Sequence, residues 1–76
     1  MTKDAKLAAI AAERGPLEHQ LYSAEIEVET KTIAVEHGVT GVTKEALEEA
    51  QARMASLKEQ IAALDERKAQ VEGESE

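Results

Sequence analysis

The chain has 76 residues and a formal charge of −7, with no cysteine and with Tyr22 as its single aromatic residue. A chain of this length forms at most one small domain, and without cysteine it has neither disulfides nor thiolate metal sites. The acid excess argues against nucleic acid or an anionic membrane surface as partner, because a phosphate backbone is bound by clustered Lys and Arg. No apolar run reaches the ~18–20 residues that span a bilayer. We therefore expect an all-α, cytoplasmic protein with no membrane association.

Residues 1–15 are predicted to form a short N-terminal helical arm. Leu7 and Ile10 are its larger apolar residues, and Gly15 followed by Pro16 is predicted to end it. A proline inside a helix lacks one N–H donor and clashes with the carbonyl four residues earlier, at a cost of about 3 kcal/mol. Proline is well placed instead as the first residue of a new helix. The apolar spacing continues in phase across this point, so the alternative is one long helix that is kinked at the proline.

A turn at residues 38–43 is predicted to join two long helices, at about 16–37 and 44–72. Gly38 suits the left-handed backbone conformation that commonly ends a helix. Thr43 is a favourable N-cap for the helix that follows. Because the connector is short, the two helices should lie antiparallel as a coiled-coil-like hairpin.

The second long helix carries the most regular apolar pattern in the chain. Its apolar positions alternate at spacings of three and four residues, which is the heptad repeat of helices that pack side by side. Residues 73–76 follow it and are expected to fray as an acidic tail. The hairpin core predicted from both helices consists of Leu17, Leu21, Val28, Val35, Leu47, Met54, Leu57, Ile61 and Leu64.

The first long helix has a second apolar face that a two-helix hairpin does not need. Tyr22, Ile26 and Ile33 fall within about 40° of one another on a helical wheel, opposite the predicted core positions. These three residues are the candidate interaction face, to be covered either by the N-terminal arm or by another copy of the chain. A core this small rarely contributes more than ~3–5 kcal/mol. We therefore expect a dimer or a higher oligomer that completes a helical bundle.

No residue pattern in the chain indicates catalysis, a cofactor or a metal. His19 and His37 lie eighteen residues apart along one predicted helix, so a single chain cannot bring both to one ion. Glu18, Glu25 and Glu29 form a row that could bind a cation or a basic partner, although such rows are more commonly solvated faces. We expect no catalytic residues, no cofactor-binding residues and no metal ligands.

These features favour a non-enzymatic protein–protein interaction module, a small self-associating helical adaptor or assembly factor. The main alternative is a small acidic inhibitor, of the type encoded by viruses, that binds a basic surface of a larger enzyme or nucleic-acid-binding complex. A weaker alternative is an oligomer that sequesters a small ligand. Mixed acidic and basic pairs along the helices favour the first function over the second, because a mimic of nucleic acid carries a denser acidic surface. Fold alone does not decide among these functions.

Overall fold

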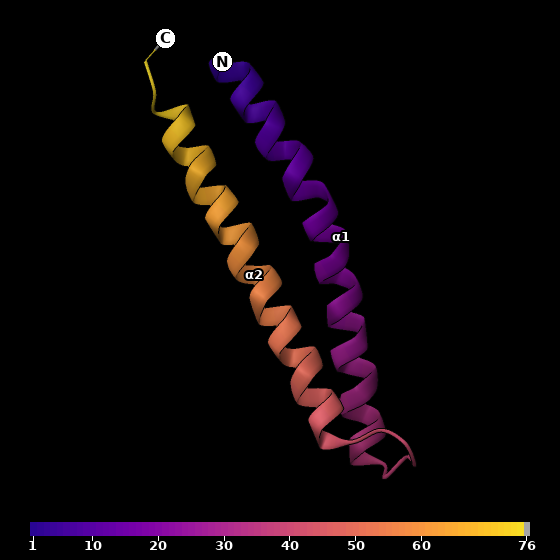
Figure 1. Ribbon diagram of the computed structural model, residues 1–76. Coiled ribbons are helices and arrows are strands. Elements are labelled where there is room, and N and C mark those ends of the chain that lie inside the picture. The colour runs from indigo at the N-terminus through magenta and orange to yellow at the C-terminus, as the bar shows by residue number, and fades with distance from the viewer. Residues whose placement is uncertain (76) are drawn as a thin grey trace.

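The computed structural model describes residues 1–75, and over that range the protein consists of two helices packed against each other (Figure 1). Helix α1 spans Lys3–Glu36 and helix α2 spans Lys44–Glu72. The helices run antiparallel, with both ends of the chain at one end of the hairpin and the turn at the other. The hairpin measures 58 × 15 × 13 Å, and its radius of gyration of 17.2 Å exceeds the value of about 11 Å for a compact domain of this length. The all-helical hairpin predicted from the sequence is confirmed.

A threonine fixes the start of each helix. Thr2 Oγ1 accepts a hydrogen bond from the Ala5 N–H at 3.1 Å, and Thr43 Oγ1 accepts one from the Ala46 N–H at the same distance. Each bond satisfies one of the N–H groups that the first helical turn leaves without a backbone partner. Thr43 is the N-cap that the sequence predicts for the second long helix.

The end of α1 is a glycine-containing cap. Gly38 has a φ of +67°, in the left-handed region that glycine adopts without steric cost. Its N–H donates to the Val35 carbonyl at 3.2 Å, and the Val39 N–H donates to the Ala34 carbonyl at 2.9 Å. This pair of bonds is the Schellman motif, and it stops the helix where the sequence predicts the turn.

The predicted short helix and the break at Gly15 and Pro16 are wrong. Helix α1 continues through both residues, so the first helix is long and contains the proline. Pro16 has no N–H to donate to the Ala12 carbonyl, but both residues are exposed, so water can supply the missing donor. The alternative of one bent helix describes the structure better, since α1 curves along its length beside a straighter α2 (Figure 1).

Packing against α2 explains why the helix does not break. Ile10 is 9% exposed and Val71, near the end of α2, is 1% exposed. Burying an aliphatic side chain contributes about 1.5–3 kcal/mol, so these two residues together offset the cost of about 3 kcal/mol for an internal proline. An ion pair of 2.9 Å between Lys6 and Glu74 adds to the attachment. The tertiary contacts therefore outweigh the local preference for a break.

The core of the hairpin is one narrow seam between the two helices. Ala24 is fully buried, and its small side chain allows the two backbones to approach closely. The buried apolar residues are Ile10, Ala24, Ala50, Leu57, Ile61 and Val71. Of the core predicted from the sequence, two residues are buried, Leu57 and Ile61. The others are half-buried: Leu17, Leu21, Val28, Val35, Leu47, Met54 and Leu64.

Replacing Leu57 or Ile61 by alanine is expected to lower the free energy of unfolding by about 2–5 kcal/mol, because each change leaves a cavity in the seam. Thermal unfolding followed by circular dichroism measures the effect. The same replacement at the exposed Glu59 or Glu66 should change stability by less than about 0.5 kcal/mol. Equal shifts for the two sets of variants would contradict this packing of α2.

The variant Pro16→Ala is expected to raise the free energy of unfolding by about 1–3 kcal/mol. Alanine restores the N–H donor, although the loss of proline also frees the unfolded chain. Urea titration measures the change. Gly15→Ala, where an added Cβ meets nothing within 4 Å, should add up to about 1 kcal/mol. A less stable Pro16→Ala variant would show that the curved path of α1 along α2 (Figure 1) depends on the proline.

Candidate interaction surface

The side of α1 turned away from α2 carries an apolar face, formed by Tyr22, Ile26 and Ile33. These side chains are 66%, 49% and 52% exposed. The N-terminal segment does not cover them, because it is part of α1 and packs along α2 instead. Single exposed apolar residues are ordinary on protein surfaces, whereas several on one helix face mark a candidate binding site.

Two different borders flank the apolar face. One border is an acidic row, in which the side chains fall within about 40° of one another around the helix. The row consists of Glu18, Glu25, Glu29 and Glu36, all of them exposed. The opposite border has polar residues without a carboxylate: His19, Ser23, Thr30 and His37. The apolar face therefore has acid on one side only.

Three ion pairs join the two sides of the hairpin. They are Lys6–Glu74 at 2.9 Å, Arg14–Asp65 at 2.6 Å, and Glu27–Arg53. From one pair to the next, the residue number rises along α1 and falls by a similar amount along the second half of the chain. An antiparallel arrangement of the two helices requires this order. One pair lies at the open end and the other two lie further along the hairpin, with Glu27–Arg53 the nearest to the turn, so each fixes the register at a different level.

These cations also alter the acidity of their partners. Hydrogen bonds from Arg14 hold the pKa of Asp65 below its usual range, because they stabilise the ionised carboxylate. The pKa of Glu27 is lowered chiefly by the hydrogen bond from Lys31, at 2.5 Å, with Arg53 adding to it. The groups are half-buried or exposed, so solvent screens their interaction and each contributes little to stability. Their role is to align the helices.

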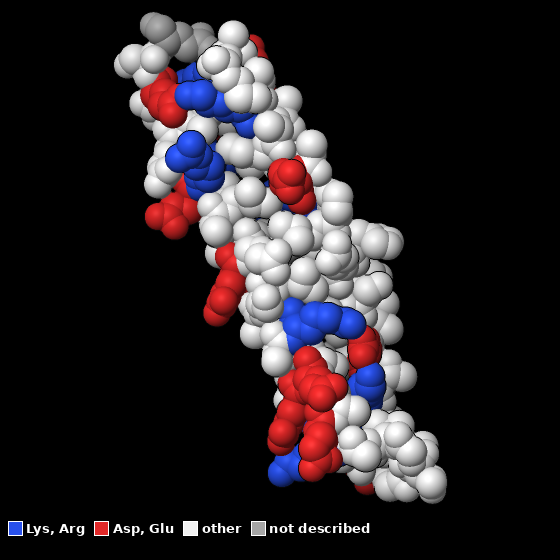
Figure 2. Space-filling model, viewed as in Figure 1, with Lys and Arg blue, Asp and Glu red and all other residues white. Residues whose placement is uncertain are grey.

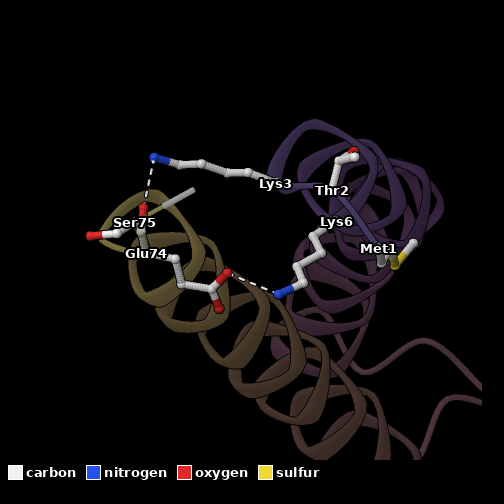
Figure 3. Close-up of a pocket in the computed structure, with 6 residues that line it drawn as sticks. All are labelled: Met1, Thr2, Lys3, Lys6, Glu74 and Ser75. Carbon is white, nitrogen blue, oxygen red and sulfur yellow. Dashed lines mark hydrogen bonds and ion pairs between the residues drawn. The ribbon is translucent and has the colours of Figure 1, made fainter.

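A hollow of about 340 Å³ lies at the open end of the hairpin (Figure 3). Lys6 Nζ is 2.9 Å from the Glu74 carboxylate, and Lys3 Nζ donates to the Glu74 carbonyl at 3.3 Å. The hollow is lined by Met1, Thr2, Lys3, Lys6, Glu74 and Ser75. The Glu74 carboxylate compensates the charge of Lys6, whereas Lys3 contacts a neutral backbone carbonyl, so the two lysines already have partners within the chain.

A second hollow, of about 230 Å³, lies between the helices, with Leu57 among its lining residues. His19 and Ser23 line it one helical turn apart, and no hydrogen bond joins them in the described structure. Arg53, which also lines it, is paired with Glu27. A nucleophile activated by a base requires such a hydrogen bond and a third group that orients the base, so this hollow has no catalytic arrangement. In the face shown by Figure 2, acidic and basic side chains are spread along the hairpin, and larger uncharged areas lie near its middle and at the turn.

Among residues 1–75, no group of three or more His, Asp or Glu side chains could hold a metal ion. His19 on α1 and His37, the C-cap of that helix, lie five helical turns apart. Neither α1 nor α2 contains a stretch apolar enough to cross a membrane in the part of the chain described.

The structure defines this protein as an antiparallel two-helix hairpin, an architecture that serves many unrelated functions. In comparisons with known proteins, no family model, curated protein or solved structure matches the chain. Function is therefore inferred from the apolar face, the acidic row and the geometry of the hairpin.

The variant Asp65→Asn should unfold at a lower temperature than the wild type at pH 7. Because the folded pKa of Asp65 is lowered, its stabilising effect is complete above its ordinary pKa of about 3.9 and is lost as the pH falls through the folded value. The gap in Tm should therefore close as the pH approaches 2. Glu59→Gln removes the same charge from an exposed position and should show little gap at either pH. A gap that persists in acid would mean that the pair with Arg14 is not its cause.

Proposed function

We propose that the protein is a non-enzymatic protein–protein interaction module that binds through the apolar face of α1, and that copies of the chain associate through this face when no other partner covers it. The observation that carries the proposal is the exposure of Tyr22, Ile26 and Ile33 in a hairpin with six buried apolar residues. The proposal retains the cytoplasmic location and the oligomeric bundle expected from the sequence.

Energetics support an added partner. Two of the six buried residues are alanines, so the seam removes little apolar area from water. Covering the apolar face would add stability at roughly 25 cal/mol for each Å² of apolar surface. Tyr22 suits an interface, because its ring provides apolar contact area while its hydroxyl group can remain hydrogen-bonded to water or to the partner.

The spacing of the face matches a common mode of recognition. Ile26 lies four residues after Tyr22, and Ile33 follows seven residues later. Side chains at such spacings lie along one line of a helix and anchor it in a groove or against a second helix.

The acidic row favours a second candidate function, in which the protein inhibits a larger protein by occupying a basic surface.

Self-association can be tested by sedimentation velocity and light scattering over a concentration series. The wild type is expected to dimerise or form a higher oligomer at high micromolar concentration, and the double variant Ile26→Ser/Ile33→Ser is expected to remain monomeric with unchanged helix content. Val39→Ser is the matched control, because Val39 is 50% exposed but lies in the turn. A wild-type protein that is a folded monomer at these concentrations would refute self-association.

A further inference from the structure

We infer that the partner of the apolar face is a helix whose own apolar stripe is bordered by Lys or Arg side chains, which lie against the acidic row of α1. This inference rests on the proposed function and specifies the chemistry of the partner. It is drawn from three features of the structure over residues 1–75: the length of the acidic row, the absence of ion pairs at three of its four glutamates, and its effect on pairing between identical copies.

The acidic row follows the apolar face from end to end. Glu18 lies one turn before Tyr22, Glu25 lies beside Ile26, and Glu36 lies one turn after Ile33. All the glutamates of the row are exposed. A helix laid along the apolar face would therefore have carboxylates close to one of its own borders over several turns. Lys or Arg at that border would gain favourable charge interactions, and Asp or Glu would be repelled.

The cations in the described part of the hairpin pair with one glutamate of the row and leave the other three without an ion pair. Glu18 forms an ion pair with Arg14, while Glu25, Glu29 and Glu36 pair with no Lys or Arg among the described residues. By comparison, Glu27, Asp65 and Glu74 each pair with a cation from the other half of the hairpin. Three carboxylates without an ion pair in the described range therefore lie along one border of the apolar face.

A second copy of the chain satisfies this surface poorly. If two apolar faces pair with their helices antiparallel, equivalent borders meet and the two acidic rows repel each other. If the two apolar faces pair with their helices parallel, the acidic row of each copy meets the polar border of the other copy, which contains His19 and His37 but no Lys or Arg. The outer side of α2 offers Lys58, but Glu59 and Glu66 are also exposed there. Self-association through the apolar face is therefore weak, and a basic helix competes with it.

The test uses the full-length protein and two synthetic helical peptides that share one Leu and Ile stripe. One peptide has Lys along the border of its stripe, and the other has Glu at the same positions. Each peptide carries a fluorophore, and binding is followed by fluorescence anisotropy. The Lys peptide should bind at least about tenfold more tightly than the Glu peptide at low salt, and the difference should shrink at 0.5 M NaCl because salt screens exposed charges.

Two double variants distinguish the effect of charge in the acidic row from the effect of the net charge of the protein. Glu25→Gln/Glu29→Gln removes two carboxylates from the acidic row and should weaken the Lys peptide about tenfold, with little effect on circular dichroism. Glu59→Gln/Glu66→Gln removes the same charge from the outer side of α2 and should change that affinity less than twofold. Equal losses in the two variants, or equal binding of the two peptides by the wild type, would overturn the inference.

The proposed function and the inference fail in different ways. If the wild type binds neither peptide but self-associates in a manner that Ile26→Ser/Ile33→Ser abolishes, the partner is a second copy, so the inference fails and the proposed function stands. If Ile26→Ser/Ile33→Ser leaves both self-association and binding of the Lys peptide unchanged, the apolar face is not the binding surface and both fail. Loss of Lys-peptide binding in that variant, together with the charge selectivity above, supports both.

Discussion

All the burial in the described part of this protein takes place in the single seam between α1 and α2, and the remaining structure depends on that contact. In proteins most of the stability of a helix comes from the packing of its apolar face and not from the helical propensity of its residues. Each helix therefore supplies the surface on which the other is stable. The seam is long and narrow, in keeping with dimensions of 58 × 15 × 13 Å, so its register must be held along the whole hairpin. Alanine at the closest contacts and ion pairs between the two sides hold it.

The same contact explains how α1 accommodates Pro16. Local chemistry disfavours a helix there, but ending the helix would remove Ile10 and the residues around it from α2. Since the proline ring and the unpaired Ala12 carbonyl lie on exposed residues, water reduces the cost of the missing bond. Continuing the helix with a bend keeps the seam intact from the turn to the open end.

A two-helix seam uses one side of each helix and leaves the opposite sides to solvent. On α2 that side is rich in charged residues and alanine, which suits exposure. On α1 it carries Tyr22, Ile26 and Ile33 with glutamates along one border. The hairpin is a candidate binding module because the solvent-facing side of α1 is apolar while that of α2 is polar. It is not a cavity that indicates binding. In the two hollows of the hairpin, Lys6 is paired with Glu74 and Arg53 with Glu27.

Local signals in the sequence were sufficient to determine the two helix ends at the turn, the Thr43 cap, the antiparallel hairpin and the separation of α1 into two apolar sides. Each of these depends on residues close together in the chain, through capping bonds, left-handed glycine and the helical period. The continuity of α1 through Pro16 was decided by tertiary structure alone, because the burial that offsets the proline comes from Val71 and its neighbours at the far end of the chain. The ion pairs of Arg14 with Asp65 and of Arg53 with Glu27 likewise appear only once the register brings distant residues together. The spacing of glutamates along one helix identifies a row of negative charge. It does not show which Lys or Arg side chains the other helix places beside that row, so the register decides which glutamates remain unpaired.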